Sequence, residues 1–233
     1  MTRRLVLNLA LTASLLSLGS AKADTMTFNL TDGNVPGLSG FTGPFASVLV
    51  NRTDTTHATI TFTSLQSTSG NAACTPATPC TYRLGGQGTA GVNVNSTTWT
   101  ATALSSNGSG ALTNAGAGNE DGWGSFNQTI DTFDGFNSSS TTVSFVLTNT
   151  SGTWAAASNV LVANASGHLA AAHIFVAGAA CTDAGAPAAC TTGFAADGGG
   201  GGPQGSVPEP TSIVLLGGIV AFTARAIQRR RVA

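Results

Sequence analysis

Short segments in which apolar and hydroxyl residues alternate constrain the fold of this chain more than any other feature. Residues 58–63 read Ala-Thr-Ile-Thr-Phe-Thr, so every second side chain is apolar. Because successive side chains of a β-strand point to opposite faces, this pattern predicts a strand with one buried and one polar face. Further segments rich in β-branched or aromatic residues are expected to form strands: 45–50, 99–104, 126–133 and 143–147.

Clusters of Gly, Asn and Ser punctuate these segments. Residues 105–110 and 114–118 are such clusters and are expected to be loops. Residues 169–176 are ambiguous, because their alanines favour a helix and their Ile-Phe-Val end favours a buried strand, and residues 154–165 leave room for one helical turn. Short strands with this punctuation predict a mainly β fold, with a single antiparallel β-sandwich or jelly-roll-like domain over residues 24–196.

Charged residues are scarce and unevenly placed. They make up 8% of the chain, against about 25% in ordinary soluble proteins. Between residues 24 and 205 there are nine acidic side chains and two basic ones, Arg52 and Arg83, which leaves a net charge of −7. Such a segment repels nucleic acid, so no nucleic-acid partner is expected, and it attracts divalent cations weakly.

The N-terminal 23 residues have the layout of a secretory signal peptide. Arg3 and Arg4 supply the positive charge, residues 5–18 supply the apolar stretch, and small residues follow it. An uncleaved membrane anchor is the alternative, but the apolar run is short for a span. We therefore expect signal peptidase to cleave after residue 23. The residues of this cleavage site are Ala21, Ala23 and Asp24.

The C-terminal end carries an ordered series of features. A glycine-rich linker over residues 197–206 precedes a Pro-Glu-Pro tripeptide, an apolar run over residues 211–227 and a cluster of arginines. A helix over residues 213–227 would be about 22 Å long, which is short for a hydrocarbon core of about 30 Å. The positive-inside rule places the arginines in the cytoplasm and the β domain outside. The residues concerned are Val207, Pro208, Glu209, Pro210, Arg225, Arg229, Arg230 and Arg231.

Segment 207–233 resembles the PEP-CTERM sorting signal of exported proteins in Gram-negative bacteria, with residues 208–210 matching its tripeptide. The resemblance implies processing by an exosortase, a membrane-embedded transpeptidase-like cysteine protease, in species that make exopolysaccharide. It also implies a protein held transiently in the inner membrane by its C-terminal helix and then placed at the cell surface or outside the cell. A permanent tail anchor is the alternative. Segments 126–136, 147–154, 170–176 and 192–195 resemble ectodomains often carried on PEP-CTERM proteins, a resemblance that implies no particular activity.

The four cysteines form two local pairs, Cys74 with Cys80 and Cys181 with Cys190. In an exported chain this spacing favours two disulfides that close small loops. Free thiols or a metal site are the alternatives, although neither pair has CxxC spacing and no histidine is near in sequence.

One cluster of carboxylates is a candidate for chemistry: Glu120, Asp121, Asp131 and Asp134. We expect solvated loop carboxylates and no cofactor. A Ca²⁺ site with Asp131 and Asp134 as ligands is an alternative, because Ca²⁺ binds oxygen ligands. Glycoside hydrolysis is another, because it uses two carboxyl groups about 5–10 Å apart.

These observations predict a non-enzymatic, exported protein with a structural or adhesive role in an exopolysaccharide matrix or biofilm. Two alternatives stay open. A carbohydrate-binding module would present Trp99, Trp123 and Trp154 on one exposed face. A secreted carbohydrate-active enzyme would bring the carboxylates between Glu120 and Asp134 into a cleft.

Overall fold

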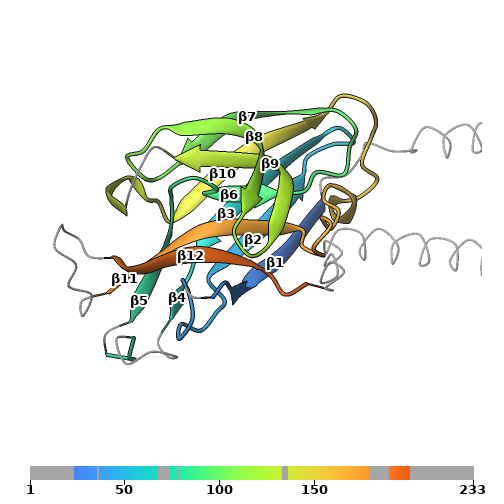
Figure 1. The fold of residues 1–233 in the computed structure, drawn as a ribbon. Helices are drawn as coiled ribbons and strands as arrows, with labels where there is room; N and C mark the ends of the chain where they lie inside the picture. Colours follow the sequence, from blue (N-terminus) through green and yellow to red (C-terminus); the bar gives the residue numbers. More distant parts are fainter. Residues whose placement is uncertain are drawn as a thin grey trace, which may run out of the picture.

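A computed structural model describes one region of the chain, residues 24–199, apart from residues 36, 68–73, 78, 133–135 and 179–188. The predicted signal peptide, the sorting segment 207–233 and residues 200–206 of the linker lie outside the described residues. Within the described region the chain forms one antiparallel sheet of twelve strands (Figure 1). The prediction of a mainly β fold is confirmed.

The strands and short helical turns follow one another along the chain. They are β1 (Asp24–Gly33), β2 (Ala46–Arg52), β3 (His57–Ser64), β4 (Gln66–Ser67), β5 (Cys80–Leu84), β6 (Ala90–Val92), β7 (Trp99–Ser106), β8 (Leu112–Glu120), β9 (Gly124–Thr132), the 3-10 turn η1 (Phe136–Ser138), β10 (Thr142–Asn149), the 3-10 turn η2 (Ala157–Asn159), β11 (Ala170–Ala177) and β12 (Ala189–Asp197). Their order across the sheet is β7-β10-β3-β2-β1-β12-β11-β6-β9-β8, with β4 paired to β5 and β5 paired to β11.

The strands predicted from alternation form the centre of the sheet. Strand β3 contains the segment 58–63, and it pairs with β2 on one side and β10 on the other. Buried and partly exposed residues alternate along all three strands. Their buried side chains belong to one hydrophobic core, in which Ile60, Phe62 and Phe145 are fully enclosed. The period of two in the sequence therefore separates the core face from the polar face.

The two ambiguous segments are resolved by tertiary packing. Residues 170–177 form β11, which lies between β12 and the strands β5 and β6. Ala172 and Ile174 on one face belong to the main core, and Ala171 on the other face belongs to a second, smaller cluster. A strand covered on both faces carries apolar residues without alternation, which explains why its sequence is ambiguous. The expected helical turn within residues 154–165 is the 3-10 turn η2.

The expectation of a loop at residues 114–118 is wrong. These residues belong to β8, which pairs with β9 through two shifts of register, between Asn114 and Gly116 and between Gly116 and Gly118. Gly116 has φ of +71°. Such shifts are typical of β-bulges, where glycine adopts the backbone conformation that other residues avoid. An irregular strand with largely exposed, small side chains has a loop-like composition.

The first and last strands of this order approach each other and nearly close the sheet. The side-chain amide of Asn114 on β8 donates to the backbone carbonyl of Ala101 on β7 over 3.1 Å. The indole nitrogen of Trp99 on β7 donates to Gln128 on β9 over the same distance. Figure 1 shows β7 and β8 together along one side of the molecule.

Strand β1 begins at Asp24, the residue that follows the predicted signal cleavage site. The Asp24 carboxylate accepts a hydrogen bond from Arg52 Nε at 2.6 Å and another from the backbone nitrogen of Ala157 at 2.9 Å. The start of the strand is therefore fixed to β2 and to η2. Among the described residues, no helix has the length and apolar character needed to cross a membrane.

Candidate functional site

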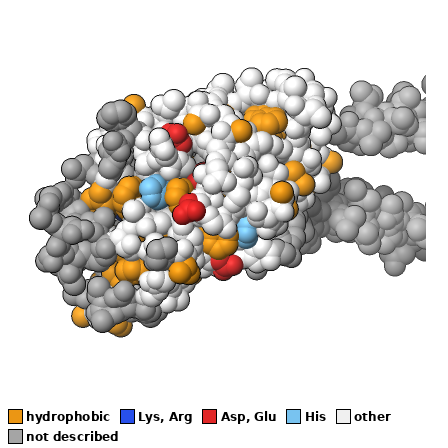
Figure 2. All heavy atoms as spheres, viewed as in Figure 1, with side chains coloured by type: hydrophobic (Ala, Val, Ile, Leu, Met, Phe, Trp, Pro, Cys, Tyr) orange, Lys and Arg blue, Asp and Glu red, His pale blue; other side chains and the backbone are white. Residues whose placement is uncertain are grey.

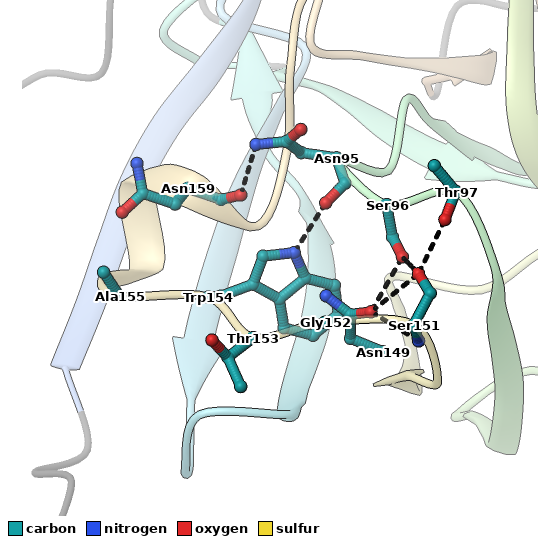
Figure 3. Close-up of a pocket in the computed structure, with 10 residues that line it drawn as sticks. All are labelled: Asn95, Ser96, Thr97, Asn149, Ser151, Gly152, Thr153, Trp154, Ala155 and Asn159. Atoms are coloured by element: carbon teal, nitrogen blue, oxygen red, sulfur yellow. Dashed lines mark hydrogen bonds between the residues drawn. The ribbon is translucent and has the colours of Figure 1, made fainter.

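A polar hollow opens where three segments meet at one end of the sheet (Figure 3). Its volume is about 510 Å³. Residues 95–97 come from the connection between β6 and β7, residues 149–155 come from the end of β10 and the loop after it, and Asn159 comes from η2. The ladder between β7 and β10 ends at the pair Trp99 and Asn149. This register places residues 95–97 next to residues 149–155.

Hydrogen bonds between the lining side chains fix the shape of this hollow. Ser96 Oγ donates to Asn149 Oδ1 at 2.8 Å, and Thr97 Oγ1 donates to Ser151 Oγ at 2.8 Å. The backbone nitrogen of Ser151 also donates to Asn149 Oδ1 at 3.1 Å. Asn149 is buried, and its side-chain oxygen links Ser96 of one segment to Ser151 of the other. Figure 3 shows this network on the right of the view.

Trp154 belongs to the base of the hollow and to the core. Only 1% of its surface is exposed. Its indole nitrogen donates to the backbone carbonyl of Asn95 at 2.8 Å, and Asn95 Nδ2 donates to the backbone carbonyl of Asn159 at 2.9 Å. Trp154 thus fixes the backbone of Asn95 at the hollow, and its own indole nitrogen has a hydrogen-bond partner, as is usual for a buried tryptophan.

The chemistry of the lining is neutral. The hollow is lined by Asn, Ser, Thr, Gly, Ala and Trp, and none of these side chains titrates near neutral pH. Hydroxyl and amide groups both donate and accept hydrogen bonds, which matches the hydroxyl groups of an uncharged sugar. The ten lining residues carry no formally charged side chain.

The three tryptophans do not form one exposed face. Trp99 and Trp123 are partly buried and pack against different clusters, and Trp154 is buried. The indole nitrogen of Trp123 donates to the backbone carbonyl of Phe194 at 3.1 Å. Each indole therefore has a partner within the domain, and the aromatic surface expected of the carbohydrate-binding alternative is not formed by these side chains.

Glu120 is the most unusual titratable residue of the described region. Its side chain is fully buried, and neither carboxylate oxygen has a hydrogen-bond partner. Burial and, secondarily, the negative charge of Asp131 raise the pKa of Glu120 from 4.5 to about 8. The carboxyl group of Glu120 is therefore enclosed by the domain and is not presented at its surface.

The other carboxylates of the predicted cluster lie apart from one another. Asp121 is exposed and accepts hydrogen bonds from Asn34 Nδ2 at its carboxylate and its backbone carbonyl. Asp131 Oδ1 accepts a hydrogen bond from the backbone nitrogen of Gly88 at 2.8 Å. Asp134 lies outside the described residues. The structure thus brings Glu120 and Asp131 together, and within the described region no three His, Cys, Asp or Glu side chains form a group that could hold a metal.

A row of rings covers the outer face of β11 and β12, beside the loop that contains Gly88. The imidazole of His173 stacks on Phe194 with centroids 4.5 Å apart and packs against Phe175 at 5.0 Å. Burial lowers the pKa of His173, although the backbone of Gln87 opposes that shift. Figure 2 shows hydrophobic and histidine side chains with acidic groups beside them, and no Lys or Arg among the described side chains in that view.

One of the two predicted disulfides is confirmed. Cys74 and Cys80 are bonded, and their Cα atoms are 5.0 Å apart. The pair Cys181–Cys190 cannot be assessed in the same way, because Cys181 and the side chain of Cys190 lie outside the described residues.

Sequence reasoning named Trp154 but did not find the hollow. Asn95, Ser96 and Asn149 carry its polar lining, and they belong to Asn/Ser/Thr clusters that occur throughout this chain. Their juxtaposition depends on strand register, for which the sequence has no local signal. No protein-family model, curated protein or solved structure matches this chain.

Proposed function

We propose that this protein is an exported envelope or extracellular-matrix protein that binds neutral exopolysaccharide. In this proposal a single β-sandwich-like domain lies between a cleaved signal peptide and a C-terminal sorting helix. Its role is structural or adhesive, and exosortase and signal peptidase are its processing enzymes. The protein passes through the inner membrane and reaches the surface or the medium.

The observation that carries the binding role is the hollow of Figure 3. Its lining is uncharged and rich in hydroxyl and amide groups, although the region from residue 24 to 205 has a net charge of −7. A hollow without charge in an acidic domain favours a neutral polyhydroxyl chain over an anionic one. The Cys74–Cys80 disulfide supports export, because disulfides persist in oxidising compartments.

The binding role is tested by filling the hollow. Gly152 is exposed, and a Cβ atom there would lie 3.8 Å from Asn149, at ordinary contact distance. Gly152→Phe should therefore leave the fold intact and occupy the space of a ligand. We expect co-sedimentation with the producer's own exopolysaccharide to weaken by about tenfold, equivalent to about 1.4 kcal/mol.

Two comparisons make this experiment specific. Thr27→Phe adds the same ring at an exposed position of β1 outside the hollow and should bind like the wild type. The wild-type protein should bind alginate, an anionic polysaccharide, less than it binds the producer's own exopolysaccharide. If the wild type, Gly152→Phe and Thr27→Phe bind the exopolysaccharide equally, the hollow is not the contact site.

The sorting role is tested separately at Glu209. In a host with its exosortase, Glu209→Ala should accumulate in the inner membrane. It should be about 2–3 kDa larger than the processed wild type, at about 110 Da for each retained residue of segment 207–233. If both proteins stay full-length and fractionate together, the C-terminal segment is a permanent anchor.

A further inference from the structure

We propose that Glu120 and Asp131 form a site for a divalent cation of Ca²⁺ type, held against the loop that contains Gly88. Glu120 is the last residue of β8, and Asp131 belongs to the neighbouring strand β9. The side chains of both residues reach the loop that contains Gly88. This site is separate from the polar hollow and does not depend on polysaccharide binding or on C-terminal processing.

The position of Glu120 is firmly determined by the backbone. It pairs with Gly124 across the β8–β9 hairpin, and its backbone carbonyl accepts a hydrogen bond from the backbone nitrogen of Trp123 at 2.9 Å. The side chain is directed onto Gly88 and Gly91, where it is fully enclosed. Both of its carboxylate oxygens lack a partner, so the enclosed group has four acceptor sites that the protein itself leaves unused.

Glycine at two positions of the neighbouring segment makes room for this carboxylate. A Cβ atom at Gly88 would overlap Glu120 Oε2, and one at Gly91 would lie 2.9 Å from Oε1. The backbone nitrogen of Gly88 donates to Asp131 Oδ1 at 2.8 Å. Both carboxylates therefore contact the same residue, and the Asp131 charge acts on Glu120.

The two arginines of the described region bind other groups. Among the described residues the arginines are Arg52 and Arg83, of which the first pairs with Asp24 and the second donates to Ser139. His173 lies across the Gly88 loop, where its backbone nitrogen donates to the Gly88 carbonyl, and burial lowers the pKa of its imidazole. A buried carboxylate without donors needs a bound cation or a proton, because burying an unpaired charge is strongly unfavourable.

The ligand atoms indicate which cation fits. The side chains of this proposed site, Glu120 and Asp131, offer carboxylate oxygens, and hard cations such as Ca²⁺ prefer carboxylate oxygens completed by carbonyls and water. Two carboxylates with incomplete protein coordination predict an affinity in the range of extracellular Ca²⁺ modules, with Kd of about 0.1–1 mM.

The experiment uses the full chain in detergent micelles, first treated with a chelator and then titrated with CaCl₂. At about 5 mM CaCl₂ we expect the Tm of the wild type to rise by about 3–8 °C. Glu120→Gln keeps the shape of the side chain and removes its charge, so its Tm should not respond to CaCl₂. Asp131→Asn should lower the response, and equilibrium dialysis should give one bound ion per wild-type chain.

Asp32→Asn is the matched control, because Asp32 is an exposed carboxylate on β1 away from the site. It should respond to CaCl₂ like the wild type. If Glu120→Gln does not fold, Asp131→Asn with dialysis still decides the question. A wild type whose Tm and bound-ion count do not change with CaCl₂ would overturn the proposal and leave a proton as the partner of Glu120.

Discussion

Because the folded state holds a proton at Glu120, this domain should become less stable as the pH rises toward 8. In the folded state the pKa of Glu120 is about 8, against an ordinary value of 4.5, because its carboxyl is buried without a donor and close to Asp131. Between these values the folded state holds a proton at Glu120 that the unfolded state has released. Stability therefore falls with rising pH in this window.

The size of this effect follows from the two pKa values. Each pH unit between 4.5 and about 8 costs the folded state about 1.4 kcal/mol, so the whole window corresponds to about 5 kcal/mol. Glu120→Gln has a side chain of the same shape that cannot ionise. Its stability should lack this contribution, and above pH 8 it should exceed that of the wild type.

The assay is urea unfolding of the full chain in detergent micelles with a chelator present, followed by tryptophan fluorescence. Trp99, Trp123 and Trp154 are all partly or wholly buried, so their emission reports on the domain. The informative quantity is the difference in unfolding free energy between wild type and Glu120→Gln at each pH. Other titrating groups such as His173 and Asp197 affect both proteins and largely cancel.

A second variant separates the two causes of the raised pKa. Asp131→Asn removes the charge beside Glu120 but leaves its burial, so the pKa of Glu120 should fall and the pH window should narrow. If the difference in unfolding free energy between wild type and Glu120→Gln stays constant within about 1 kcal/mol from pH 4.5 to 8.5, the raised pKa of Glu120 is refuted. That result would mean that Glu120 has a partner or access to water.

Three further predictions concern the backbone, the disulfide and the N-terminus. Gly88 and Gly116 have nearly the same φ, +69° and +71°, but a Cβ atom at Gly116 meets nothing within 4 Å. Gly116→Ala should therefore lower the unfolding free energy measured in urea by about 1–2 kcal/mol, and Gly88→Ala should lower it clearly more. Equal losses of unfolding free energy in the two variants would contradict the close packing of Glu120 against Gly88. Reduction of the Cys74–Cys80 disulfide, which joins residues with a sequence separation of 6, should lower the unfolding free energy by about 2 kcal/mol. If the midpoint of urea unfolding does not change in the presence of a reductant, the disulfide does not stabilise the domain. N-terminal sequencing of the exported protein should begin at Asp24, and a mature chain beginning at Met1 would contradict the signal peptide.

Local regularities in the sequence predicted the central part of the fold. The alternation in residues 58–63 identifies β3 and its buried face, because the period of two is a property of the strand itself. The spacing of Cys74 and Cys80 identifies their bond for a similar reason, since both ends of the small loop are near in sequence. The sequence also predicts export and sorting, but those segments lie outside the described residues.

Other features were decided by contacts between distant segments. Strand β8 has the composition of a loop, and its pairing with β9 depends on the bulges around Gly116. The hollow depends on the register that joins residues 95–97 to the end of β10, in a chain where Asn, Ser and Thr clusters are common.

Glu120 shows the physical reason for this division. In the sequence it is one of several carboxylates in a polar stretch, which are ordinarily solvated. Its burial results from two glycines on another part of the chain, Gly88 and Gly91, which leave room for its oxygens. A periodic pattern determines which face of a strand is apolar, but desolvation of a charge depends on which distant backbone covers it, and only the tertiary structure determines that.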